Sequence, residues 1–132
     1  ERHCKNAIAI AKYLKSCDKV EWVDYPDLED DKYNSLAKKY LPKGSCGVMA
    51  FSVKGGREKA VEFMDSLKLI TIVTHVADAR TCLLHPASHT HRQLTDEQLK
   101  ESGVAPDLIR LSVGLESVDD LIDDLKQALE KI

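Results

Sequence analysis

An arginine in the middle of an apolar segment is the residue of this sequence best suited to chemistry. Arg110 lies within residues 108–113, Leu-Ile-Arg-Leu-Ser-Val. Side chains alternate across a strand, so Arg110 points away from the face shared by Ile109, Leu111 and Val113. A guanidinium held there needs an anionic partner, and its planar fork binds carboxylates through two hydrogen bonds. The residues alone leave two interpretations open: a ligand carboxylate, or a salt bridge to one of the 22 acidic residues of the chain.

A second candidate is the histidine-rich segment 85–91, His-Pro-Ala-Ser-His-Thr-His. Its histidines have the i, i+4 and i+6 spacing of a metal site, but that spacing serves a metal only on a helix. Pro86 disfavours a helix there, and the segment contains no cysteine or acidic residue. We therefore expect no metal ligand in the chain. The structural alternative is a loop in which Ser88 and Thr90 bond backbone groups.

Two other patterns favour structural interpretations. Lys-Gly-Gly-Arg at 54–57 precedes an expected helix, where an anion could bind, but the full phosphate-loop pattern is absent and a turn is expected. The acidic positions of the last helix are expected to form a solvated face whose first turn suits the helix dipole; they are Asp119, Asp120, Asp123 and Asp124.

The elements that must position these residues follow from hydrophobic periodicity and from breaker residues. Helices are expected over 2–16, 29–41, 56–67, 95–103 and 117–132, and strands over 20–25, 47–53, 69–73, 81–84 and 108–113. No regular alternation of strand and helix runs through the chain. The pattern predicts an α+β fold with a small, mostly antiparallel sheet and helices packed on one face.

Length and composition restrict the class of protein. The 132 residues suit one domain, 1–132, with 43% apolar and 31% charged residues. The net charge of -3 argues against a nucleic-acid partner, and no apolar stretch is long enough for a membrane span. The first residues do not form a signal peptide, and we expect a fragment of a longer protein. The four cysteines are widely spaced, which favours free thiols and a cytoplasmic location.

The segments 85–91 and 108–116 (Leu-Ile-Arg-Leu-Ser-Val-Gly-Leu-Glu) together resemble the C-terminal domain of the Cys/Met-metabolism family of pyridoxal-phosphate enzymes. Within the family, the chain is most similar to O-acetylhomoserine sulfhydrylases. The resemblance implies the small C-terminal domain of a fold-type-I enzyme. It extends over all 132 residues but only over the last third of the family. Nothing resembles the family's cofactor-lysine segment, so the large cofactor-binding domain is expected to be absent.

The resemblance also implies roles for individual residues. The family's arginine at the position of Arg110 holds the substrate α-carboxylate, and the segment containing Ser88 and Thr90 borders the active site. His75 stands where related enzymes have serine or asparagine against the substrate, so it could donate a hydrogen bond or lie in the domain interface. These four are the expected substrate-binding residues, and no catalytic or cofactor-binding residue is expected in the chain.

The implied activity of the parent enzyme is the reaction of O-acetylhomoserine with sulfide or a thiol, giving homocysteine or methionine plus acetate, with pyridoxal phosphate as cofactor. A γ-lyase or cystathionine γ-synthase of the same family is the alternative enzyme. The alternative from another class is a folded module that has no activity as an isolated chain. The resemblance further implies a homo-oligomer, a tetramer when intact, with no nucleic-acid or membrane partner.

Overall fold

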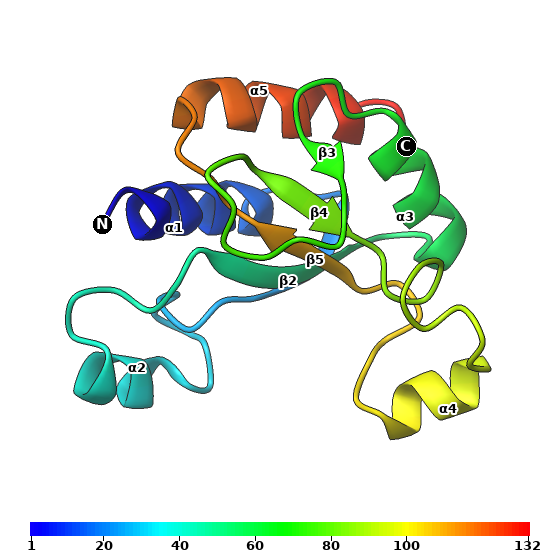
Figure 1. The fold of residues 1–132 in the computed structure, drawn as a ribbon, viewed down its shortest axis with the longest axis horizontal. Helices are drawn as coiled ribbons and strands as arrows, with labels where there is room; N and C mark the ends of the chain where they lie inside the picture. The colour runs from blue at the N-terminus through cyan, green and yellow to red at the C-terminus, as the bar shows by residue number, and fades with distance from the viewer.

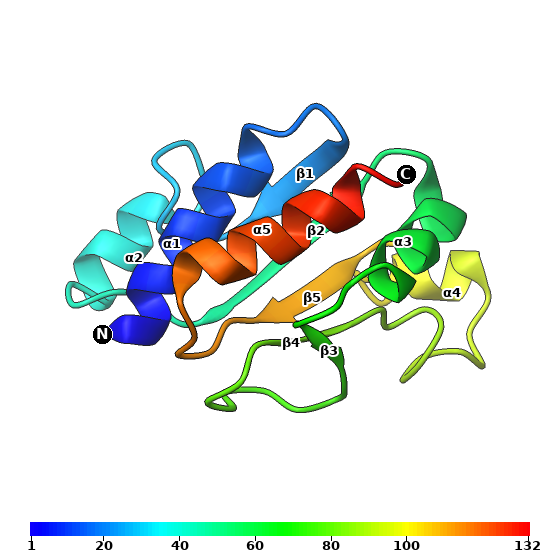
Figure 2. The ribbon, with the colours of Figure 1, turned by 90° about the horizontal axis from the view of Figure 1, so that it is seen from above.

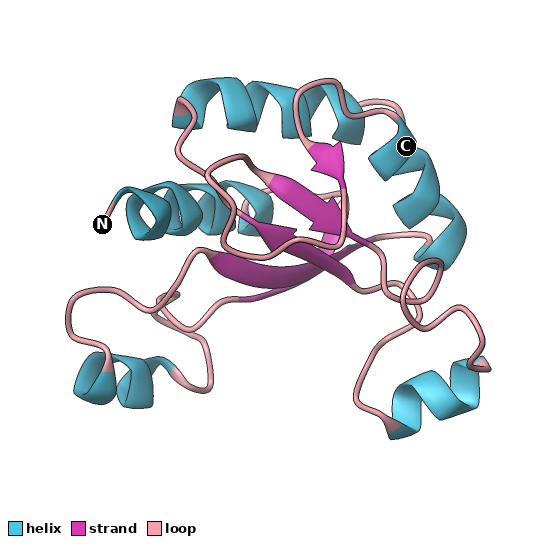
Figure 3. Cartoon of the chain, in the orientation of Figure 1, coloured by secondary structure: helices cyan, strands magenta, loops and turns pink.

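The computed structural model describes residues 1–132 as five helices and five strands joined mostly by long loops (Figure 3). In chain order they are α1 (Arg2–Lys15), β1 (Val20–Asp24), α2 (Asn34–Tyr40), β2 (Val48–Val53), α3 (Gly56–Asp65), β3 (Thr71–Ile72), β4 (Cys82–Leu84), α4 (Asp96–Glu101), β5 (Ile109–Ser112) and α5 (Val118–Leu129). No helix combines the length and the apolar character that crossing a membrane requires.

The strands form one sheet in the order β1-β2-β5-β4-β3. Its pairs are antiparallel except β3 with β4. The chain is therefore an α+β fold with a mostly antiparallel sheet, as the sequence predicts. β5 is the last strand in the sequence, and it occupies the centre of the sheet between β2 and β4.

Three helices cover one face of the sheet and enclose the core. In Figure 1, α5 lies above the sheet, with α1 and α3 at its two sides and α2 and α4 below it at opposite ends; in Figure 2, α1 and α5 cross over β1 and β2. The expected alternation in β5 is confirmed, since Ile109, Leu111 and Val113 are fully buried in this core. They pack with side chains of the three covering helices, among them Ile10, Phe63 and Leu125.

The opposite sheet face carries Arg110 and has no helix over its centre (Figure 1). Arg110 pairs with Ala50 of β2 on one side and with Leu84 of β4 on the other. Arg110 and Ala50 are half-buried, and Leu84 is buried. The architecture thus places a half-buried guanidinium among largely apolar neighbours on the sheet face that no helix covers.

The prediction that the acidic residues of the last helix face solvent is wrong for Asp124. This carboxylate is buried and accepts the backbone N–H groups of Lys68, Leu69 and Ile70 at 2.8, 2.9 and 2.8 Å. Because these amides bond Asp124 and not a neighbouring strand, β3 is reduced to Thr71–Ile72 from the expected 69–73. A carboxylate accepting three amides stabilises the junction between α3 and the sheet.

Other local expectations have mixed outcomes. Thr95 and Gln98 form a capping box at the start of α4, and the expected turn at 54–57 is present, with a φ of 99° at Gly55. Ser117 precedes α5 without forming a side-chain cap. α2 begins at Asn34, later than expected, because Asp31 accepts the N–H of Tyr33 at 2.8 Å and stabilises a turn there.

Candidate functional site

Arg110 has only part of its hydrogen-bonding capacity occupied. Its Nη2 donates to the carbonyls of Thr74 and His75 at 3.0 and 3.3 Å. Its Nε is buried without any acceptor, and no ion pair within the chain involves the guanidinium. The interpretation of Arg110 as a salt-bridge partner within the chain is therefore wrong. Its positive charge and its unpaired Nε–H remain to be satisfied by an anionic acceptor from outside the chain.

The side chains next to Arg110 on the neighbouring strands are uncharged. Besides Ala50 and Leu84, Cys82 lies near the guanidinium, and its thiol donates to the carbonyl of His75 at 3.3 Å. Burial raises the pKa of Cys82, so the sulfur stays a protonated, uncharged group. An anion reaching Arg110 would encounter no negative charge on this strand.

His75 contributes its backbone, and its side chain is on the surface. The ring is 65% exposed and has Nδ1 3.6 Å from Oδ2 of Asp78. The backbone N–H of Arg80, with the nearby Arg80 charge, lowers the pKa of Asp78 and keeps it ionised. The structure thus brings His75 next to Arg110 through its carbonyl oxygen, with its imidazole free to reach solvent.

The loop after β4 is organised around His85, which is fully buried. Its Nε2 lies 2.9 Å from the carbonyl of Pro106 and its Nδ1 lies 2.8 Å from Oγ of Ser88. A carbonyl only accepts, so Nε2 carries the proton and Nδ1 accepts from the Ser88 hydroxyl. Thr90 is exposed and its hydroxyl contacts Nδ1 of His91 at 2.8 Å. Both hydroxyls bond histidine rings in their own loop, and neither contacts Arg110.

Burial lowers the pKa of His85 below its ordinary value of 6.5. The folded chain therefore keeps this ring neutral while the unfolded chain takes up a proton. The contribution of the neutral His85 ring to folding stability is therefore fully present above pH 6.5, and it is lost as the pH falls toward the pKa of the folded state. We expect the free energy of unfolding of the wild type to fall by up to about 1.4 kcal/mol per pH unit in that window. Urea unfolding between pH 7.5 and 5 measures it, in steps of roughly half a pH unit.

The matched variants are His85→Gln and His89→Gln. Glutamine at position 85 retains a donor and an acceptor without titrating, so the pH dependence should flatten. His89 is exposed, but its Nδ1 lies 2.9 Å from the His85 carbonyl and its charge adds to the lowering of the His85 pKa, so its replacement should make the slope shallower without removing it. Identical slopes in wild type and His85→Gln would show that the buried ring is not held neutral.

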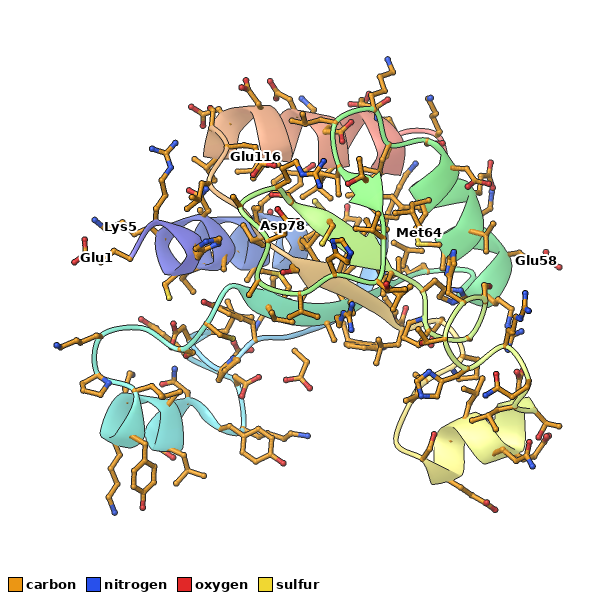
Figure 4. All side chains as sticks on the ribbon, viewed as in Figure 1. Glu1, Lys5, Glu58, Met64, Asp78 and Glu116 are labelled. Atoms are coloured by element: carbon orange, nitrogen blue, oxygen red, sulfur yellow. The ribbon has the colours of Figure 1, made fainter.

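A network around Glu116 lies beside this site and is not evident from residue types alone. Glu116 accepts the N–H and the hydroxyl of Thr81 at 2.6 and 2.8 Å. It immediately precedes α5, and Figure 4 labels it together with Asp78 of the loop that it holds. One sequence pattern could have indicated this network. Polar residues and a glycine recur at every second position from Arg110 to Glu116, and in the structure these positions all face the segment 74–81.

The residues of this chain do not fit a pyridoxal-phosphate site. A lysine that carries this cofactor needs enclosed surroundings, an acidic partner for the ring nitrogen and a phosphate cradle. Every lysine here is exposed except Lys59, which is half-buried and pairs with Glu62. No group of three or more histidine, cysteine or acidic side chains is arranged to hold a metal ion.

The fold and site define an α+β domain whose strand-centred arginine has no ion-pair partner in the chain. The family model for Cys/Met metabolism PLP-dependent enzymes matches residues 1–130. The chain belongs to this family, as its sequence resemblance predicts.

Curated relatives include two classes of enzyme. The chain is 46% identical to O-acetyl-L-homoserine sulfhydrylase of Leptospira meyeri and 48% identical to homocysteine synthase of Schizosaccharomyces pombe. It is 44% identical to L-methionine gamma-lyase of Fusobacterium nucleatum. These matches extend over 98–100% of this chain but only 30–33% of the relatives, so the chain spans about a third of their length.

A solved structure with the same fold is a putative O-acetylhomoserine (thiol)-lyase from Campylobacter jejuni. It matches with a TM-score of 0.90 and 39% identity over 98% of this chain and 31% of its own. That protein contains N'-pyridoxyl-lysine-5'-monophosphate. The likeness supports the α+β fold described above and an enzyme as the parent of this chain.

Proposed function

We propose that residues 1–132 are the C-terminal, substrate-carboxylate-binding domain of an O-acetylhomoserine sulfhydrylase. The parent enzyme would convert O-acetylhomoserine and sulfide to homocysteine and acetate, or use methanethiol to give methionine, which makes it a transferase of methionine biosynthesis. The observation that carries the proposal is Arg110, a strand-centred guanidinium with a buried, unpartnered Nε and no carboxylate from its own chain.

In this proposal Arg110 orients the amino acid. A carboxylate can accept from the guanidinium N–H groups that the carbonyls of Thr74 and His75 leave unoccupied. Such an arrangement fixes the direction of the substrate and makes no bond itself. The His75 side chain and the loop carrying Ser88 and Thr90 would complete the pocket from the exposed side.

Pyridoxal phosphate would be held by the parent outside this chain, where it would withdraw electrons from the bound amino acid. The lysines of residues 1–132 are too exposed for that role, so the isolated chain is expected to be inactive. The alternative enzyme is a γ-lyase or cystathionine γ-synthase, which the likeness to methionine gamma-lyase favours. His75 departs from the serine usual in lyases, which argues against that alternative.

The intact parent is proposed to be a cytoplasmic homo-oligomer, a tetramer. Large apolar side chains are exposed on and beside α2, as surfaces covered in an assembly often are; they are Tyr33, Leu36, Tyr40 and Leu41. As an isolated module, the chain would present this surface to solvent.

A direct comparison of two activities tests the proposed function. With pyridoxal phosphate bound, the full-length protein should release acetate from O-acetylhomoserine in a sulfide-dependent reaction and produce little methanethiol from methionine. Rapid elimination from methionine without net thiol addition would establish the lyase instead. The control is the 132-residue chain, which should give neither reaction and no stoichiometric lysine-linked absorbance band with pyridoxal phosphate.

A further inference from the structure

The segment 74–81 lies along β5 and its extension, held at regular intervals. Arg110 bonds the carbonyls of residues 74 and 75, and two residues on, Ser112 accepts the N–H of Ala77 at 2.9 Å. Two residues further, Gly114 donates its N–H to the Thr81 hydroxyl at 2.8 Å. Every second residue of the strand and its extension thus holds the same loop.

The contact at Ser112 fixes an unusual point of this loop. Ala77 has a φ of 60°, and it is the only non-glycine residue of the chain with a positive φ. L-residues enter this left-handed region only at an energetic cost, so contacts must hold it there. The Ser112 hydroxyl supplies one, since it accepts the N–H that this backbone conformation directs at the strand.

The carbonyls that contact Arg110 lie two and three residues before Ala77 in the same loop. The carbonyls of Thr74 and His75 occupy Nη2, while Nε has no acceptor. Movement of residues 74–77 would free Nη2 and allow the guanidinium to turn. The direction of the unoccupied donors therefore depends on a loop with two nearby side-chain anchors, the Cys82 thiol at the His75 carbonyl and the Ser112 hydroxyl at the Ala77 N–H.

We infer that Ser112 is a positioning residue for carboxylate binding: it holds the Ala77 turn, and the turn holds the Arg110 guanidinium in its binding orientation. This inference rests on the proposed role of Arg110. Ser112 would then contribute to substrate selection without contacting the substrate. Its effect would be transmitted through the backbone of residues 74–77.

The decisive experiment compares an amino-acid substrate with its neutral carboxamide in the full-length enzyme. Ser112→Ala should raise KM for O-acetylhomoserine by about tenfold with kcat within about twofold, because uniform binding is weakened and chemistry is not. Its preference for the carboxylate over the carboxamide should fall by a similar factor. Hydrogen exchange of a peptide spanning residues 74–80 should be faster in the variant, because the Ala77 amide loses its acceptor.

Two variants make the comparison specific. Ser52→Ala removes another buried serine from the same sheet face, but that hydroxyl has no hydrogen-bond partner, so KM and exchange should not change. Ser112→Thr keeps the acceptor and should retain the preference for the carboxylate. Arg110→Lys, which removes the planar fork, is the reference for loss of that preference.

The outcomes separate the inference from the proposed function. If Arg110→Lys loses the preference but Ser112→Ala keeps it, the positioning role is wrong and the function of Arg110 stands. Equal losses of activity with the acid and the amide in Ser112→Ala would also overturn the positioning role, because that pattern reflects general destabilisation. If Arg110→Lys retains the preference, the proposed carboxylate site itself is wrong.

Discussion

Replacement of Arg110 by alanine in the full-length enzyme is expected to lower kcat/KM for the amino-acid substrate by roughly 10²–10³, the effect of losing a bidentate, partly desolvated contact with a carboxylate. Thermal unfolding should stay unchanged or rise slightly. The guanidinium has no carboxylate partner in its own chain, and its Nε is buried without an acceptor, so removal of this unfavourable group offsets the loss of the two hydrogen bonds to the carbonyls of Thr74 and His75. Steady-state kinetics and calorimetry on the same preparation measure both effects.

The combination of the two effects distinguishes a binding residue from a structural one. Arg57→Ala is the matched control, because Arg57 forms an exposed ion pair with Asp96 on the surface. Such pairs contribute about 0–1 kcal/mol, and both activity and stability should be nearly unchanged. If Arg110→Ala instead lost stability together with activity, or kept its activity within a few-fold, the arginine would have a structural role and the proposed function would lose its main support.

Features governed by local patterns were predictable from the sequence. The strand alternation around Arg110, the capping box at Thr95 and the buried stripe of α5 each depend on residues close in the chain, and each is present in the structure. Asp124 was predicted wrongly because its environment is set by a segment more than 50 residues away. A pattern of acidic residues cannot show which member accepts distant backbone amides.

The candidate site shows the same limit. The position and chemistry of Arg110 followed from the sequence, as did the proximity of its strand to the segment that starts at His85. The lack of any carboxylate partner, the backbone role of His75 and the contact between Ser88 and the His85 ring required the three-dimensional structure. These features depend on pairing between β4, β5 and the loop 74–81, which single-sequence periodicity does not define.

Gly114→Ala is expected to be the most destabilising single-methyl addition in this region. An added Cβ would lie 2.3 Å from the carbonyl oxygen of Ala79 and 2.6 Å from the carbonyl carbon of Arg80. Both are backbone atoms, so relief requires moving the loop. That movement would stretch the bond from Leu115 N–H to the Ala79 carbonyl, now 2.8 Å, and the Thr81 contacts with Glu116. Overpacking commonly costs about 1–3 kcal/mol; with these bonds weakened, we expect about 3–4 kcal/mol in urea unfolding.

The matched control is Gly103→Ala, in which the added methyl group meets backbone strain and no steric clash, whereas at Gly114 it meets a clash and no backbone strain. Gly103 has a φ of 78° but no atom within 4 Å of an added Cβ, so alanine there meets backbone strain without a clash. That strain is about 1–2 kcal/mol. Gly114 has an ordinary φ, and its glycine is required only by the close approach of the loop. A larger loss of stability at Gly103 than at Gly114 would show that the loop yields easily, and a loop that yields could not hold the guanidinium of Arg110 in one orientation.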